Sequence, residues 1–172
     1  MAAQRAAPTA PGEARASRPG GSPVNAPTLV FAWGNPSRGD DALGPLFAEA
    51  VEAMGLKGVE CLTDFQLQVE HVLDLRDRSR VLFVDATVDA VAPFAVSPLA
   101  PAAVAGFGFT SHALSPATLL AVFREVEGDP PPAWLLAIAG EQWELGQPAE
   151  ARALTHLDAA LAWARRWLEQ PA

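Results

Sequence analysis

Short apolar runs alternate along the chain with segments in which apolar residues recur every three or four positions. The runs have the length of β-strands, and the periodic segments have the spacing of amphipathic helices. This alternation is typical of a parallel sheet flanked by helices. The predicted strands are Thr28–Trp33, Val59–Leu62, Arg80–Val84, Phe94–Pro98 and Ala133–Ala139. The dense runs LVFAW, RVLFVDA and AWLLAIAG are predicted to be buried on both faces of the sheet.

Three helices are predicted from the periodic segments. The first carries the apolar stripe Leu43, Leu46, Phe47, Ala50, Val51 and Met54. The second is predicted to begin with Ser115 as N-cap and Pro116 at the first helical position. Its stripe is Leu119, Val122, Phe123 and Val126, and that of the last helix is Leu154, Leu157, Leu161, Ala164 and Leu168. This register puts His156 on the polar side of the last helix.

The chain divides into an N-terminal extension and one domain. Residues 1–26 are rich in Ala, Pro, Gly and Arg and have too few bulky apolar side chains to offset the entropy cost of ordering. We therefore predict a disordered extension at 1–26 and a single domain at 27–172. The predicted fold class is α/β, a three-layer α/β/α domain of the phosphorylase/hydrolase-like kind with a twisted, mostly parallel sheet.

Charge and composition exclude several classes of function. The chain has 12 basic and 20 acidic residues, and three of the arginines lie in the extension, so the domain is the more acidic part. Such a surface repels a phosphate backbone, and nucleic-acid binding is not expected. No apolar run approaches the roughly 20 residues of a membrane span and no leader is evident, so we expect a cytoplasmic protein. A net charge well away from zero and no surplus apolar stripe favour a monomer. Cys61 is the only cysteine, which excludes an internal disulfide.

Three polar side chains fall where strands are predicted to lead into helices. Asp41 follows the first strand, Asp85 ends RVLFVDAT, and His112 lies in the loop before Ser115. Ligands of open parallel sheets bind beyond the carboxyl ends of the strands, where such loops gather. Two carboxylates and one imidazole that meet there would form a three-ligand site with open positions, suited to zinc, nickel or iron.

Each of these residues also has a purely structural explanation. An acidic residue in a strand-to-helix turn commonly binds helix N–H groups. For Asp40 or Asp41 taken singly, this explanation is as good as that of a metal ligand. Asp85 alone could bind a neighbouring loop, and His112 alone has the sequence context of an ordinary surface histidine. Cys61 is interpreted as a small core residue.

Three segments together resemble one protein family. GNPSRGDDALGP, VDAT and SHALSPATLLAV are similar to motifs of the [NiFe]-hydrogenase maturation endopeptidases. The resemblance implies a twisted sheet between helices and an enzyme that trims the C-terminal extension of the hydrogenase large-subunit precursor after nickel insertion. It also implies that Asp41, Asp85 and His112 coordinate metal and carry the catalysis.

The resemblance extends to supporting residues and to a branch of the family. It implies that Asp40 holds the turn by binding helix N–H groups, with Asn35, Gly34 and Gly39 shaping the same turn. TDFQLQVEHVLDL, with Gln66, Leu67 and Glu70, and AGEQWELGQP, with Gly140, Glu141 and Gly146, resemble the branch for NAD-reducing, bidirectional hydrogenases.

Several alternatives remain open from the sequence. The metal is expected to be nickel carried by the precursor, with no organic cofactor, but a resident zinc-type site would use the same residues. A metal-dependent checkpoint or chaperone that binds the precursor without cutting it also needs these ligands. A phosphate or nucleotide hydrolase would use the same turn as an anion cradle, and the adjacent aspartates disfavour it.

Overall fold

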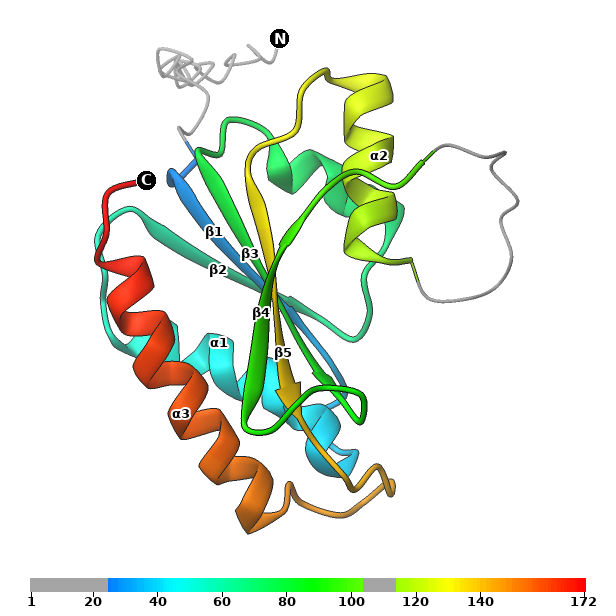
Figure 1. Cartoon of the computed structure of the whole chain (residues 1–172), viewed down its shortest axis with the longest axis vertical. Helices are drawn as coiled ribbons and strands as arrows, with labels where there is room; N and C mark the ends of the chain where they lie inside the picture. The colour runs from blue at the N-terminus through cyan, green and yellow to red at the C-terminus, as the bar shows by residue number, and fades with distance from the viewer. Residues whose placement is uncertain (1–24, 104–113) are drawn as a thin grey trace, which may run out of the picture.

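A five-stranded sheet organises the part of the chain that the computed structural model describes, residues 25–103 and 114–172 (Figure 1). The strand order is β2-β1-β3-β5-β4. The strands are β1 Thr28–Trp33, β2 Val59–Asp64, β3 Arg80–Thr87, β4 Phe94–Leu99 and β5 Ala133–Ala139. All neighbours are parallel except β4, which pairs antiparallel with β5. The prediction of a mostly parallel sheet is confirmed, and β2, β3 and β4 are longer than predicted.

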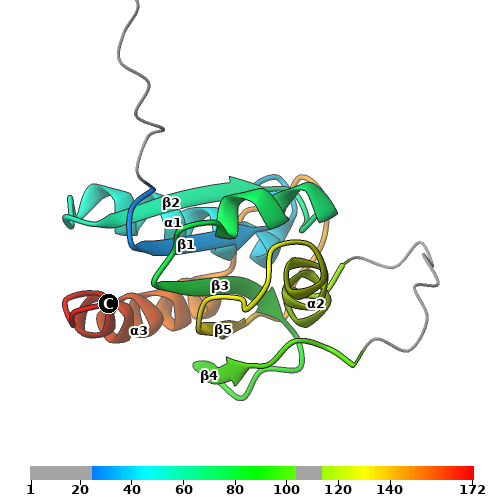
Figure 2. The same cartoon turned by 90° about the horizontal axis from the view of Figure 1, so that it is seen from above.

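Helices cover both faces of this sheet. The helical elements are the 3-10 helix η1 Gly39–Ala42, α1 Leu43–Ala53, the 3-10 helix η2 Val69–Leu75, α2 Pro116–Val126 and α3 Ala151–Leu168. One face packs against α1 and α3, and the other packs against η2 and α2. Figure 2 shows α2 and α3 on opposite sides of the sheet. The predicted three-layer α/β/α class is therefore confirmed.

The alternation of side chains along the central strands builds two cores. Val30 and Ala32 of β1 pack in the cluster with α1 and α3, whereas Leu29 and Phe31 pack in the cluster with η2 and α2. Because successive side chains of a strand point to opposite faces, a continuous apolar run fills both layers. β1 and β3 are buried on both faces as predicted. β5 keeps half-buried residues, because only the edge strand β4 lies beyond it.

The helix stripes were predicted less accurately than the strands. Leu120 of α2 is buried, whereas Val126 is exposed at the end of that helix. Leu154 in the first turn of α3 is also exposed, and the prediction that His156 lies on the polar side of α3 is wrong. The His156 ring is buried because its Nδ1 lies 2.8 Å from the carbonyl oxygen of Ala139, so a hydrogen bond compensates for its loss of water.

Two further sequence predictions concern helix α2 and the membrane. Ser115 is the N-cap of α2, and its hydroxyl oxygen accepts a hydrogen bond from the N–H of Thr118 at 3.1 Å. Pro116 opens the helix as predicted. Across residues 25–103 and 114–172, no helix is both long and apolar enough to traverse a bilayer.

Candidate functional site

The carboxyl ends of β1 and β3 bring Asp41 and Asp85 together. The two strands are parallel neighbours, and Ala32 pairs with Val84, so Asp85 lies beside the last residue of β1. Asp41 is carried back to this point by the turn after β1, where its Oδ2 accepts a hydrogen bond from the N–H of Asn35 at 3.0 Å. The carboxylates are close enough for the charge of Asp41 to act on Asp85. Both residues thus lie where the ligands of parallel sheets bind, beyond the carboxyl ends of the strands.

The carboxyl group of Asp85 titrates far from its ordinary range. Burial raises its pKa from 3.8 to about 7, a hydrogen bond with the backbone of Ala86 opposes the shift, and the negative charge of Asp41 adds to it. A carboxylate that is desolvated and faces a second carboxylate is unfavourable without a nearby cation. A divalent metal ion bound between Asp41 and Asp85 would remove this cost, so the pair fits such a ligand chemically.

We expect Asp85→Asn to stabilise the metal-free protein at pH 8. Because the pKa is near 7 in the folded protein and 3.8 unfolded, the folded state binds the proton more tightly. The stability of the wild type therefore falls as the pH rises from about 4 to above 7. Asparagine lacks this titration, so the gain in the free energy of unfolding should be on the order of 2–4 kcal/mol at pH 8 and shrink toward pH 5.

Urea unfolding at several pH values measures this gain. Asp89→Asn removes a carboxylate that is exposed in the loop after β3 and controls for the loss of one negative charge. A difference between wild type and Asp85→Asn that does not change with pH would contradict the expected tight binding of a proton by folded Asp85.

Asp40 has a different position and different partners from its neighbour. Its side chain is 0% exposed. Its Oδ2 accepts hydrogen bonds from the N–H groups of Glu141 at 2.8 Å and Gln142 at 3.0 Å, and its Oδ1 accepts one from the N–H of Glu150 at 2.8 Å. Glu150 is the N-cap residue of α3. The expectation that Asp40 binds helix N–H groups thus needs correction, since it joins η1 to the loop between β5 and α3.

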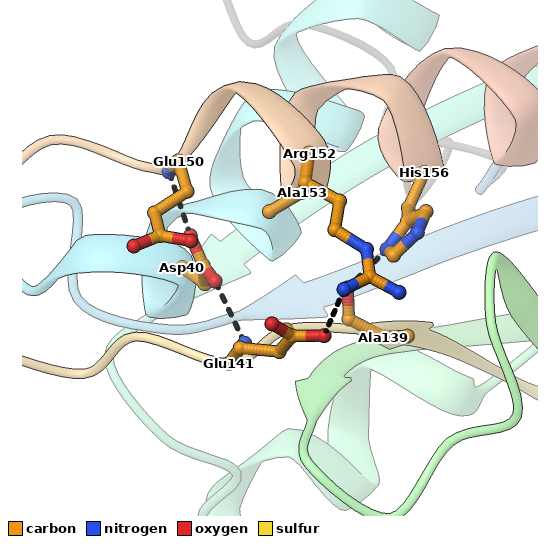
Figure 3. A pocket seen from close by; sticks show the side chains of 8 residues that line it. Asp40, Ala139, Glu141, Glu150, Arg152, Ala153 and His156 are labelled. Carbon is orange, nitrogen blue, oxygen red and sulfur yellow. Dashed lines mark hydrogen bonds and ion pairs between the residues drawn. The ribbon is translucent and has the colours of Figure 1, made fainter.

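Figure 3 shows Asp40 between Glu141 and Glu150, with His156 and Arg152 on the adjoining part of α3. These residues line a concavity with no room for a water molecule. Arg152 and Glu141 form an exposed ion pair at 3.0 Å across its mouth. The arrangement is therefore a packed structural joint, and the carboxylate of Asp40 has no space beside it for a ligand.

Two glycines allow the turn after β1 to pack this closely. Gly39 has φ +54°, and a Cβ there would lie 1.8 Å from Oε1 of Gln142. Gly34 has φ +146°, and a Cβ there would lie 2.0 Å from the carbonyl oxygen of Asp41. Neither position has space for a side chain, and both backbone conformations favour glycine. Asn35 holds the same turn, because its Oδ1 accepts a hydrogen bond from the N–H of Ser37 at 2.9 Å.

The histidines have separate environments. His112 lies outside the described residues. His71 is engaged within its own segment, with Nδ1 accepting a hydrogen bond from the N–H of Gln68 at 2.9 Å and Nε2 lying 3.2 Å from Oδ2 of Asp64. Within residues 25–103 and 114–172, no three His, Cys, Asp or Glu side chains are arranged to hold a metal ion. The described part of the site is therefore the carboxylate pair.

Asp64 is a further acidic residue at this edge, and it was not among the ligands predicted from the sequence. It is the last residue of β2, and its carbonyl oxygen accepts a hydrogen bond from the N–H of Gly34 at 3.1 Å. Its carboxylate is paired with His71. The strand-end rule that selected Asp85 would also have found Asp64, had β2 not been predicted to end at Leu62.

Cys61 lies away from this edge and is unsuited to act as a nucleophile. It lines a groove of about 330 Å³ between α1 and the outer strand β2, together with Glu52 and Glu60. Burial, followed by the charges of Glu52 and then Glu60, raises the pKa of its thiol to about 11. The thiolate is scarce at neutral pH, and the residue is half-buried and packs against the core cluster of α1 and α3, in partial agreement with the prediction of a core residue.

Comparisons with known proteins identify the fold. The sequence matches no protein-family model and no curated protein. The structure is similar to that of the [NiFe] hydrogenase maturation protease HycI from Thermococcus kodakarensis KOD1, with a TM-score of 0.65, 19% identity, and coverage of 84% of this chain and 94% of that one. It is also similar to the hydrogenase maturating endopeptidase HybD from E. coli, with a TM-score of 0.63, 22% identity, and coverage of 82% and 91%.

A third similar structure is the hydrogenase 2 maturation peptidase from Thaumarchaeota archaeon SCGC_AB-539-E09. Its TM-score is 0.59, its identity 21%, and the coverage 83% of this chain and 97% of that one. Likeness at such low identity establishes a shared fold over nearly the whole domain.

Proposed function

We propose that this protein is an endopeptidase that removes the C-terminal extension of a [NiFe]-hydrogenase large-subunit precursor after nickel insertion. Substrate-bound nickel would be recognised by Asp41, Asp85 and His112. The observation that carries this proposal is the carboxylate pair formed by Asp85 of β3 and Asp41 of η1, in which the burial of Asp85 calls for a cation. The similar structures are named as hydrogenase maturation proteases or peptidases, which supports the choice of reaction.

His112 lies outside the described residues, and we propose it as the third ligand on its sequence motif SHALSP. Asp85 points to the same face of β3 as Val81 and Phe83, because the three residues are spaced two apart. Val81 and Phe83 pack on the face that α2 covers. Carboxylate, carboxylate and imidazole suit a divalent first-row metal.

The donor set also suits a metal that is shared for a short time. Held by these residues, a divalent ion would supply Lewis-acid chemistry at the scissile carbonyl. Three ligands leave coordination positions for groups of the precursor, whereas closed cysteine-rich sites hold metal permanently. Asp41 and Asp85 then hold the ion, and one of them can orient the attacking water through its second oxygen.

We expect the protein to cleave the nickel-loaded precursor and to leave the nickel-free precursor intact. Without nickel the ligands have no ion to recognise on the substrate. Mass spectrometry of the precursor after incubation with the purified protein measures the loss of the C-terminal extension. Equal cleavage of both precursors would contradict recognition of nickel, and metal bound to the purified protein alone would favour a resident site.

The same experiment separates the enzyme from a checkpoint protein. A checkpoint would bind the nickel-loaded precursor without changing its mass. A phosphate or nucleotide hydrolase is disfavoured by the turn itself, because the N–H of Asn35, which an anion cradle would offer to phosphate, is bound by Asp41. We further propose that the protein is a cytoplasmic monomer. The motifs around Gln66 and Glu141 favour the branch of the family that processes NAD-reducing hydrogenases.

A further inference from the structure

Four large apolar side chains are exposed around the candidate site. They belong to loops that leave the carboxyl edge, the end of the sheet at which the parallel strands terminate (Figure 1). Their exposed fractions are 68% for Phe65 after β2, 63% for Val88 and 78% for Val91 after β3, and 71% for Leu145 after β5. We call these four residues the apolar rim.

Backbone hydrogen bonds link two of the loops of the rim to the turn that carries Asp41, and link the third loop to the one after β5. The N–H of Gly34 donates to the carbonyl oxygen of Asp64, next to Phe65, at 3.1 Å. The N–H of Gly146, next to Leu145, donates to the carbonyl oxygen of Ser37 at 2.7 Å. The loop after β3 joins through the N–H of Gly140, which donates to the carbonyl oxygen of Thr87 at 3.1 Å. The rim thus lies on loops that are linked to one another at the edge of the sheet that carries the carboxylate pair.

Single exposed apolar residues are ordinary, but several on one edge indicate a surface that becomes covered. We propose that the apolar rim is the docking surface for the folded, metal-loaded precursor. This inference rests on the proposed function. The fitting partner is a protein surface whose apolar residues surround a bound divalent cation, so that the cation meets Asp41 and Asp85 while the apolar residues meet the rim.

The charge at the centre of the rim selects this kind of partner. Asp41, Asp64 and Asp85 lie at the same edge, and the chain carries a formal charge of −8. Anionic lipid head groups and nucleic acid would be repelled at this position. Apolar contacts around a buried polar centre are the usual arrangement of a protein interface.

The test compares two rim variants with a matched control. The rim variants are Val88→Ser with Val91→Ser, and Leu145→Ser. The control is Val126→Ser, which changes a valine that is 61% exposed at the end of α2, near the opposite edge of the sheet (Figure 1). With nickel-loaded precursor as substrate, we expect each rim variant to raise KM roughly tenfold and to change kcat less than twofold. The control should match the wild type, and melting temperatures should be unchanged.

The outcomes separate the inference from the function on which it rests. If the wild type does not cleave the nickel-loaded precursor, the proposed function fails first. If the wild type cleaves it and the rim variants keep the wild-type KM, the docking surface is refuted and the function stands. A wild-type dimer that the rim substitutions dissociate, or vesicle binding that they abolish, would assign the rim to a second copy or to a membrane and overturn the inference.

Discussion

Asp41→Asn and Asp85→Asn are each expected to lower the rate of precursor cleavage on the order of 10³-fold. On the proposed function each substitution replaces a carboxylate metal ligand by a neutral amide, and a metal-assisted transition state would lose several kcal/mol of stabilisation without it. A loss of about 4 kcal/mol corresponds to three powers of ten in rate. The measurement is the initial rate at which nickel-loaded precursor loses its extension, followed by mass spectrometry, with His112→Ala measured in parallel.

The behaviour of Asp85→Asn distinguishes a functional carboxylate from a structural one. The variant should be more stable than the wild type at pH 8 when free of metal and should still fail to cleave. Asp158→Asn, which changes an exposed carboxylate on α3 away from this edge, should keep wild-type activity. Full activity of Asp41→Asn or Asp85→Asn in properly folded protein would remove that residue from the site.

Asp40→Ala is expected to lower the free energy of unfolding by about 3–5 kcal/mol. The substitution leaves three part-buried N–H groups without an acceptor, those of Glu141, Gln142 and Glu150, and each group that stays unsatisfied costs about 1–3 kcal/mol. Part of that cost is recovered where the loop moves and admits water. Asp40→Asn should lie between the wild type and Asp40→Ala, because its single carbonyl oxygen satisfies some of the donors.

Urea unfolding combined with amide hydrogen exchange tests this role of Asp40. In Asp40→Ala the amides of Glu141, Gln142 and Glu150 should exchange faster than in the wild type. Asp158→Ala removes an aspartate that is exposed on α3 and is the control. A loss below about 1 kcal/mol, with these amides still protected, would show that other contacts hold the loop.

The contrast between two adjacent aspartates shows how far the sequence could be interpreted. The pattern GNPSRGDDAL between a strand and a helix predicted that the pair divides its work, with Asp40 structural and Asp41 directed to the site. The partners of Asp40 could not be predicted, because they lie 101, 102 and 110 residues further along the chain. A sequence pattern can predict only local capping, in which the N–H groups of the following helix are the donors. The donors to Asp40 are instead N–H groups of the loop before α3.

The buried sides of the helices and the position of His156 also depend on contacts between distant parts of the chain. The strand bounds of β1 and β5 were predicted to the residue, since a dense apolar run has sharp ends. The buried side of α2 was misplaced by part of a turn, and His156 was assigned to solvent. An imidazole is accepted in a core only where a buried acceptor faces it, and the carbonyl oxygen of Ala139 comes from a different element.

The sequence by itself determined the elements, their order and the class of the fold, because hydrophobic periodicity is a local property of the chain. It also placed Asp41 and Asp85 at strand ends, because parallel strands present their carboxyl ends at one edge. Only the tertiary structure decided that burial raises the pKa of Asp85, that Asp40 joins η1 to the loop before α3, and that four apolar side chains are exposed on loops at the edge of the pair. Burial and long-range hydrogen bonds depend on which distant segments meet, and no local pattern contains that information.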